Sequence, residues 1–311
     1  MKMPRPWILP TISAWLIFTI APTSLAARAA TGPHASSSGS LASTAADGGQ
    51  SKVNGGEQEP STEPTTEEII AEYLVLVKDK KKSTEVQVAL EKLGRMYSDS
   101  LEQREQIQLQ LDRKQGDTAE LKRQMRDGDR LRTQLAAETW KAFRFRPRDN
   151  AVNKKIWAKA VWVLGGMSDH GSKYLWKAFE DKRYSKDSKA QADCIRQIGR
   201  TKDYGQFEKI LDLLKHHDNQ VIAAAAQAFQ HYGAAPGKVR QECTKHLVKQ
   251  LESFDNEARG GGGSGAGRRL GATKGPMIRA LKVITGESYD NSLAWTRFWN
   301  KNKNNRKLWK D

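Results

Sequence analysis

The feature that most restricts the fold is a spacing of 34 residues that occurs twice, between Gly165, Gly199 and Gly233. Each glycine closes a run of apolar residues at helical intervals, and a short polar turn and a second amphipathic segment follow it. A helix pair of this length cannot bury its apolar face alone, so consecutive pairs must stack on one another. We therefore predict an all-α array of helix pairs in which each of the three glycines is a left-handed helix C-cap.

A fourth glycine continues the pattern when an insert is taken into account. Gly286 follows Gly233 by 53 residues, and the glycine-rich stretch 258–275 accounts for the excess over the period. The stretch from 260 to 275 contains eight glycines and three basic residues, which predicts a flexible, basic surface loop. Its Lys274 is followed by glycine and not by the Ser or Thr of a phosphate-binding loop.

Residues 218–233 have the pattern of a known repeat family. Asp218 is followed three residues later by Val221, then by paired alanines, a large apolar residue and the closing Gly233. This segment resembles a HEAT-like repeat of the type found in secreted bacterial proteins, and 150–286 follows it more loosely. A tetratricopeptide array has the same period, but residues 162–165 do not have its spacing. The resemblance implies a right-handed α-solenoid of HEAT-like helix pairs, which commonly serves as a binding surface and names no partner.

The first 29 residues have the order of a secretory signal peptide. Lys2 and Arg5 precede an apolar run over 7–20, and small residues at 24–29 offer a cleavage site. We predict a secreted or periplasmic protein exported through a Sec-type signal peptide, with an uncleaved N-terminal membrane anchor as the alternative. Residues 30–64 are rich in Ser, Thr, Gly and Pro and acidic toward their end, which predicts a disordered acidic linker.

Residues 65–148 are expected to form N-terminal helices and a charged helical arm. Thr65 and Glu68 have the spacing of a capping box, and apolar residues follow at helical intervals as far as residue 97. Residues 98–142 are strongly charged with sparse apolar positions, which predicts an exposed helical arm or hairpin with breaks at Gly116 and Gly128. No segment alternates with a period of two, so we expect no sheet.

The repeat domain is predicted to span 149–311 and to end in an aromatic cap. Trp295, Phe298 and Trp299 lie at helical spacing after a helix start at 290–291. Bulky aromatic residues can cover the last apolar face of a helical array, and the alternative is an exposed aromatic binding site. Cys194 and Cys243 both fall on apolar stripes, which leaves open buried thiols or a disulfide.

The charge of the chain indicates what kind of partner it could bind. The 311 residues include 52 Lys and Arg against 36 Asp and Glu, and the balance is 48 against 29 from residue 73 onward. Aromatic and basic residues alternate over 143–148, and such alternation can hold a polyanion by charge and stacking. The candidate partner-binding residues are Arg144, Arg146, Arg148, Lys154, Lys155, Trp295 and Trp299.

No pattern in the sequence supports catalysis or metal binding. No serine lies in a Gly-x-Ser-x-Gly elbow, and the adjacent His216 and His217 would point about 100° apart on a helix. We predict no catalytic residue, no metal, no cofactor and no small-molecule substrate. The first hypothesis is a non-catalytic scaffold or adaptor that binds another protein. The alternative is a binder of acidic polysaccharide, anionic lipid or nucleic acid through its basic faces.

Overall fold

The computed structural model describes residues 64–146, 149–183 and 186–311, and over these ranges its regular elements are all helices, as predicted. They belong to the second of two compact units, which spans residues 60–311. The predicted signal peptide, and the predicted linker up to residue 63, lie outside the described residues. The α-helices are α1 (Thr66–Leu76), α2 (Ser83–Asp112), α3 (Thr118–Trp140), α4 (Asn150–Gly165), α5 (Ser168–Phe179), α6 (Ser188–Arg200), α7 (Phe207–Leu213), α8 (Asn219–Ala228), α9 (Gly237–Arg259), α10 (Gly263–Thr285) and α11 (Ser292–Asn302).

Capping side chains set the starts of many of these helices. The predicted capping box is present, because the Glu68 amide donates to Thr65 Oγ1 at 3.3 Å and the Thr65 amide donates to Glu68 Oε2 at 2.8 Å. These contacts satisfy first-turn amides that have no partner within the helix, so they fix where it begins. A side-chain oxygen also accepts a hydrogen bond from a first-turn amide at the starts of α3, α4, α6, α8 and α11. The capping residues are Asp117, Asp149, Asp187, Asp218 and Asn291.

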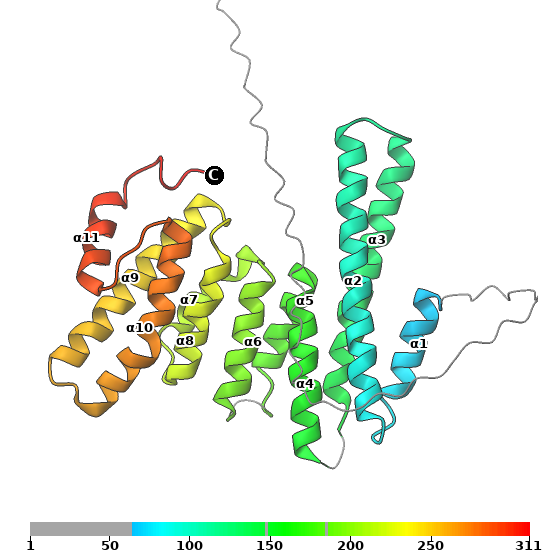
Figure 1. Cartoon of the computed structure of the whole chain (residues 1–311), viewed down its shortest axis with the longest axis horizontal. Helices are drawn as coiled ribbons and strands as arrows, with labels where there is room; N and C mark the ends of the chain where they lie inside the picture. The colour runs from blue at the N-terminus through cyan, green and yellow to red at the C-terminus, as the bar shows by residue number, and fades with distance from the viewer. Residues whose placement is uncertain (1–63, 147–148, 184–185) are drawn as a thin grey trace, which may run out of the picture. The chain divides into compact units, whose positions relative to one another are not determined.

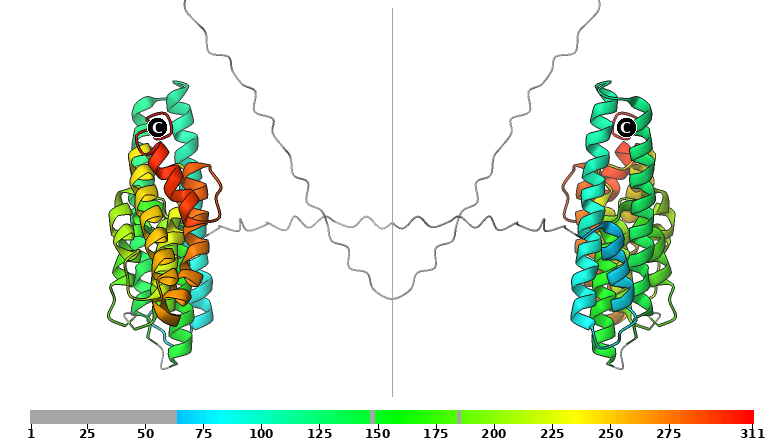
Figure 2. Two further views of the ribbon diagram at one scale, coloured as in Figure 1. Left: turned by 90° about the vertical axis from the view of Figure 1, so that its left-hand side faces the viewer. Right: turned by 90° about the vertical axis from the view of Figure 1, so that its right-hand side faces the viewer.

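Five helices, α2, α4, α6, α8 and α10, pack one against the next in a series that we call the stacked row (Figure 1). Helices α5, α7 and α9 pack against members of this row. One apolar core runs through it, and in each of the five helices a core residue is fully buried: Leu90, Ile156, Ile195, Val221 and Leu281. Helix α1 packs on α2 at one end, and α11 packs on α9 at the other (Figure 2).

The glycine period does not arise from the predicted C-caps. Gly165, Gly199 and Gly233 do not have left-handed backbones; Gly286 does, with φ of 76°, and it ends α10. The prediction is therefore wrong for the three glycines that set the period. It assumed that a glycine after an apolar run reverses the chain, whereas these glycines have a packing role.

Each of the three glycines lies where the next helix of the stacked row comes close. A Cβ on Gly165 in α4 would lie 2.2 Å from Gln197 Oε1 of α6. A Cβ on Gly199 in α6 would lie 2.4 Å from Ala228 Cα of α8, and Gly233 repeats the contact with α10 at 3.0 Å. Because real Cβ atoms do not approach other atoms so closely, only glycine permits this packing without a shift. The 34-residue period therefore marks positions at which the next helix of the stacked row comes close to a glycine.

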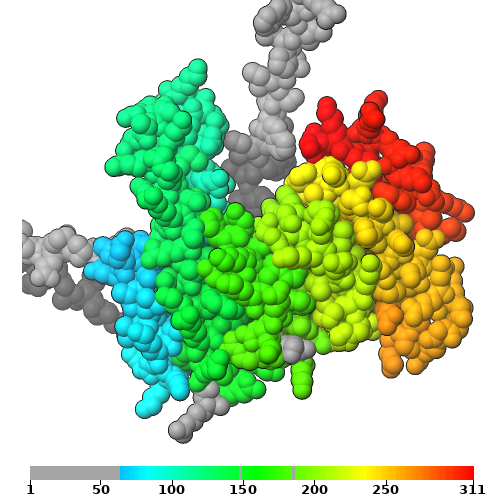
Figure 3. Space-filling view, turned by 180° about the vertical axis from the view of Figure 1, so that it is seen from behind, coloured from blue at the N-terminus to red at the C-terminus, as the bar shows by residue number. Residues whose placement is uncertain are grey.

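Helices α2 and α3 form the charged arm as a helical hairpin whose tip stands clear of the other helices (Figure 3). The turn includes Gly116, as predicted, with φ of 82°. The predicted break at Gly128 is wrong, because α3 continues through it. Gly128 instead makes room for the buried guanidinium of Arg132, since a Cβ there would lie 3.3 Å from Arg132 Nη1.

The predicted surface loop at 258–275 is largely helical. Helix α9 continues to Arg259 and α10 begins at Gly263, so residues 260–262 alone separate them. Ala266, Thr273 and Met277 are buried at helical intervals where α10 packs along α9. Each glycine in a helix costs about 1 kcal/mol relative to alanine, and burial of this stripe offsets that cost. The many glycines of 258–275 predicted a loop, whereas its buried residues have the spacing of a helix.

The C-terminal aromatic residues pack as a cap over this end of the core. Trp295 is fully buried, and its indole Nε1 donates to the Tyr289 carbonyl at 3.0 Å. The chain then turns back toward α9, which has no side-chain cap of its own. The Gly237 amide at the start of α9 donates to the carboxylate of Asp311, so the cap comes from the far end of the unit.

Candidate functional site

A basic cavity of about 770 Å³ lies where α4 and α6 begin. A narrower groove of about 380 Å³ continues from it between the two helices and shares part of its lining. We call the two together the basic trough. Its charged lining comprises Arg146, Lys154, Lys155, Arg183, Lys186 and Lys189, with Asp187 and Asp193 as the carboxylates.

The starts of α4 and α6 bring these side chains together. Asp149 and Asp187 cap α4 and α6, with oxygens that accept from the amides of Ala151 at 2.7 Å and Ala190 at 3.1 Å. The two helices therefore begin at the same edge of the stacked row, and lysines that follow the two caps face one trough. Lys155 and Lys189, which stand one 34-residue period apart, both line the groove.

Two of the cations in the trough are held by neighbouring carboxylates. Lys154 Nζ lies 2.8 Å from Asp187 Oδ2, and this contact, followed by the Ala190 amide, lowers the pKa of Asp187. Arg183 Nε donates to Asp181 Oδ1 at 2.8 Å, and the same guanidinium lies 4.7 Å from the centroid of the Trp157 ring. The positions of these two charges are therefore set before any ligand arrives.

Three further cations of the trough are exposed: Arg146, Lys186 and Lys189. Within the described ranges, none of the three has a carboxylate at ion-pair distance. Arg146 is near enough to Asp181 to help Arg183 lower the pKa of that carboxyl, and all three cations are exposed to anionic groups that enter from solvent. The trough therefore combines a fixed pair of charges with three that are free to adjust.

The groove between α4 and α6 adds an apolar surface to this charge. Its lining includes Trp157, Ala158, Val161, Ala190 and Cys194 beside the charged residues named above. Cys194 is buried, and burial raises the pKa of its thiol to about 12, so the thiol stays protonated at neutral pH. The thiol is therefore part of the apolar lining and no nucleophile at neutral pH. Cys194 and Cys243 are both free and buried, so no disulfide joins them.

A second groove, of about 510 Å³, lies where α2, α4 and α6 meet. It exposes Trp162, which retains 51% of its accessible surface. Lys159 Nζ lies 5.1 Å and the Arg200 guanidinium 5.0 Å from the centroid of its ring. Lys159 also pairs with Glu91, and this contact lowers the pKa of that carboxyl. This groove therefore holds an exposed aromatic ring between two cations, one of which is paired with a carboxylate.

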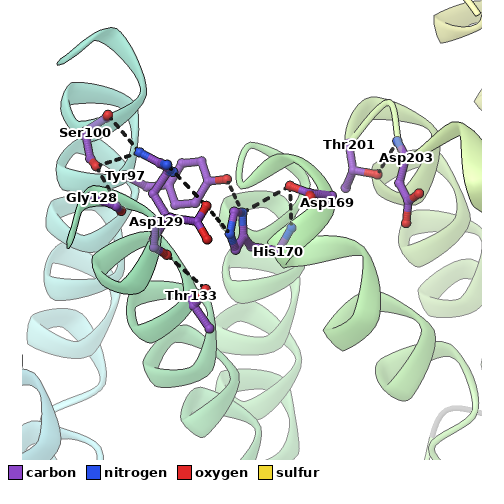
Figure 4. Close-up of polar contacts among 10 residues, drawn as sticks. Tyr97, Ser100, Gly128, Asp129, Thr133, Asp169, His170, Thr201 and Asp203 are labelled. Atoms are coloured by element: carbon purple, nitrogen blue, oxygen red, sulfur yellow. Dashed lines mark hydrogen bonds and ion pairs between the residues drawn. The ribbon is translucent and has the colours of Figure 1, made fainter. Parts of the chain in front are cut away.

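A polar network fastens the arm to α5 (Figure 4). The buried Arg132 donates through Nη1 to the Ser100 carbonyl at 3.1 Å, and its Nη2 lies 3.3 Å from Asp129 Oδ1. Asp129 Oδ1 in turn lies 3.4 Å from His170 Nε2, and Tyr97 Oη lies 3.0 Å from His170 Nδ1. Burial raises the pKa of Tyr97 to about 12, so its phenol stays neutral. These polar groups contact one another, so the network holds α2, α3 and α5 together.

The predicted partner-binding residues separate into distinct locations. Arg146, Lys154 and Lys155 come together in the trough, and Arg148 lies outside the described residues. Arg144 is exposed outside the trough lining. Trp295 has no accessible surface to offer a partner, and Trp299 is half-buried with its ring 6.3 Å from that of Trp309.

Sequence reasoning missed Arg183, Lys186 and Lys189, which belong to the next repeat. The period was the available signal, because advancing Lys155 by 34 residues gives Lys189. In the described part of the chain, no group of three or more His, Cys, Asp or Glu side chains is placed to hold a metal ion. No helix of that part is long and apolar enough to cross a membrane.

No protein-family model, curated protein or solved structure matches the chain.

Proposed function

We propose that this protein is a non-catalytic scaffold or adaptor that binds another protein through the exposed face of the stacked row. The observation that carries this proposal is the basic trough, a concavity built jointly by successive helices of the row and containing both charge and apolar surface. Concave surfaces that combine apolar area with a few placed polar groups are typical of binding sites. Helical repeats offer such surfaces over several units without a built-in reaction centre.

We also propose that the helices of the stacked row and their neighbours form a right-handed solenoid of HEAT-like helix pairs. The glycine contacts support it, because the same close approach recurs from α4 to α6 and from α6 to α8. Polar contacts at the helix starts recur as well, with Lys154 bonded to Asp187 at 2.8 Å and Ser188 Oγ to Asp218 Oδ2 at 2.6 Å. Repeats that contact only their neighbours by a constant set of interactions are the basis of solenoid folds.

Export to the cell envelope or beyond is part of the proposal and is supported by the order of residues 1–29 alone. Determination of the N-terminal residue of the protein recovered from the envelope or medium tests it. A start just after residue 26 or 29 is expected, whereas a start at Met1 on a membrane-bound protein would favour the anchor.

Cross-linking followed by mass spectrometry, on the mature protein in its native envelope extract, tests the binding function. We expect one dominant protein partner, cross-linked to lysines of α4 and α6 such as Lys155 and Lys189, that is still detected at high salt, with fewer cross-links because salt screens the exposed cations. A matched variant with both lysines changed to glutamine removes these reactive amines and keeps the fold. Absence of any protein partner at low and at high salt would overturn the proposal.

The alternative, a binder of acidic polymer or an anionic lipid surface, is favoured by the excess of 48 basic over 29 acidic residues from residue 73 onward. Binding to a polyanion weakens steeply with salt because it releases counterions. Loss of all protein cross-links at high salt, with acidic polymer co-purifying at low salt, would select this function over the first.

A further inference from the structure

We infer that the basic trough binds a short acidic peptide segment of the partner protein, with one apolar side chain of that segment in the groove between α4 and α6. This inference rests on the proposed scaffold function and names the chemistry of its partner. It is carried by three properties of the trough, namely the excess of positive charge, the apolar groove that adjoins it and the length of the combined site.

The charges of the cavity are not balanced by the chain's own carboxylates. Among the charged residues that line it, Asp187 is the only carboxylate, and Lys154 already neutralises it at 2.8 Å. Arg146, Lys186 and Lys189 remain as exposed cations at the same opening. A ligand with two or three negative charges would complete the ion pairs that the described residues leave open.

The adjoining groove distinguishes among anionic ligands. Its lining of Trp157, Ala158, Val161 and Ala190 presents carbon atoms along much of its length, and its volume of about 380 Å³ accommodates a leucine or phenylalanine side chain. Sulfated sugars and phosphodiester backbones carry no aliphatic or benzyl side chain to fill it. An acidic peptide can place several carboxylates in the cavity and an apolar side chain in the groove. An anionic lipid that put an acyl chain in the groove would bring a single headgroup to the three exposed cations, so the geometry favours a peptide.

The length of the trough limits the segment. From Ser188 to Asp193 the trough follows α6 for five residues, which at a rise of about 1.5 Å per residue is about 8 Å, and Lys186 extends it beyond the start of the helix. An extended peptide advances about 3.3 Å per residue, so three or four residues fill the trough. We therefore expect two or three acidic residues to lie within four positions of the apolar one.

Fluorescence anisotropy with defined probes tests this inference. The first probe is a labelled short peptide in which three consecutive glutamates are followed directly by a leucine. The second has serine in place of that leucine, and the third has glutamine in place of the glutamates. A labelled heparin fragment and a labelled oligothymidine represent the two polyanion classes. We expect the first peptide to bind at least ten times more tightly than the second or the third.

Variants of the full chain locate the site. Changing both Lys186 and Lys189 to Glu is expected to weaken the first peptide at least tenfold. The matched control changes Lys238 and Lys303 to Glu in the separate basic cluster near the C-terminal end, and it should leave binding unchanged. Ala158→Tyr fills the groove from an exposed helix position, and it should weaken the leucine peptide but not the serine peptide. Unchanged far-UV circular dichroism and melting temperature show that each variant is folded.

The outcomes separate this inference from the proposed function. Equal weakening by the trough and control variants, or no effect of Ala158→Tyr on the leucine peptide, would overturn the acidic-peptide site. Tighter binding of heparin or oligothymidine than of the peptide would overturn it as well, in favour of a polyanion. If a protein partner is cross-linked to the stacked row but no acidic peptide binds the trough, the inference fails and the scaffold function stands.

Discussion

The α2–α3 hairpin of the arm and the part of the stacked row from α4 to α8 are held together by different contacts. In the arm, helices α2 and α3 meet around the buried guanidinium of Arg132, whose partners are Ser100 of α2 and Asp129 of α3. In the row, Gly165 leaves room for the Gln197 side chain of α6, and Gly199 lets the backbone of α8 approach at Ala228. The arm is therefore specified by directional polar bonds, and the row by shape. A substitution that one region tolerates should be costly in the other.

The largest effect is expected from the core of the row. Phe229 is fully buried between α8 and its neighbours, so Phe229→Ala should reduce the free energy of unfolding by about 3–5 kcal/mol. Urea denaturation measures the change. Trp162→Ala is the matched control, since Trp162 is half exposed and its loss should cost less than about 1 kcal/mol. An unchanged melting temperature for Phe229→Ala would show that the repeat core is misassigned.

The glycine contacts should give the next largest effect. Gly199→Ala places a Cβ 2.4 Å from Ala228 Cα, where backbone and not a flexible side chain must move. Such overpacking costs about 1–3 kcal/mol. The control is Gly271→Ala in α10, where nothing lies within 4 Å of the new Cβ and where alanine should stabilise by about 0.5–1 kcal/mol. Opposite signs for these two changes in thermal denaturation are the expected result. Equal signs would contradict the packing role of the period.

The polar fastening of the arm can be measured by a double-mutant cycle. Asp129→Ala leaves the buried guanidinium of Arg132 short of a partner and should destabilise by about 1–2 kcal/mol. Arg132→Met replaces the charge with an apolar chain of similar length and should cost less. The double variant should recover most of the loss caused by Asp129→Ala, which corresponds to a coupling energy of about 1 kcal/mol. Simple additivity of the two changes would show that the contact contributes nothing.

The smallest effect is expected at the helix starts of the row and depends on pH. Asp187→Asn keeps a capping oxygen and removes the charge that pairs with Lys154. The pKa of Asp187 is lowered in the folded protein, first by Lys154, so its contribution is present above the unfolded pKa of about 4 and lost as the pH falls below it. The free energy of unfolding of the wild type should therefore fall by about 0.2–1 kcal/mol more than that of the variant between neutral pH and about pH 3. If the stability of both proteins changed equally with pH below neutrality, the ion pair of Asp187 with Lys154 would contribute nothing.

Much of the fold was predictable because local signals determine it. The capping box at Thr65, the capping role of Asp218 and the helical turn at Gly116 all follow from contacts within a few residues. The role of Gly199 was not predictable in the same way, since the close approach that it permits involves a helix about thirty residues away. Composition also misled at 258–275, where a buried stripe from Ala266 to Met277 decides the structure over the glycines.

The candidate site was predicted in part for the same reason. Arg146, Lys154 and Lys155 stood out because they cluster in sequence, and the trough contains all three. Lys186 and Lys189 complete it only because α6 packs beside α4. The apolar groove likewise exists between two helices and has no signal within either one. A site shared by consecutive repeats is visible in sequence only if the repeat units are aligned with each other first.

The return of the C-terminal residues to α9 has a consequence for the order of synthesis. The amide of Gly237 bonds to Asp311, which is 74 positions away, and Arg240 Nη2 donates to the carbonyl of Lys310 at 2.8 Å. Contacts between neighbouring units of the row join residues about thirty positions apart, so those units can pack while the ribosome is still extending the chain. The start of α9 cannot be capped in this way until residue 311 has been made. This end of the unit therefore matures last, and a nascent chain held at an earlier residue would leave the start of α9 uncapped.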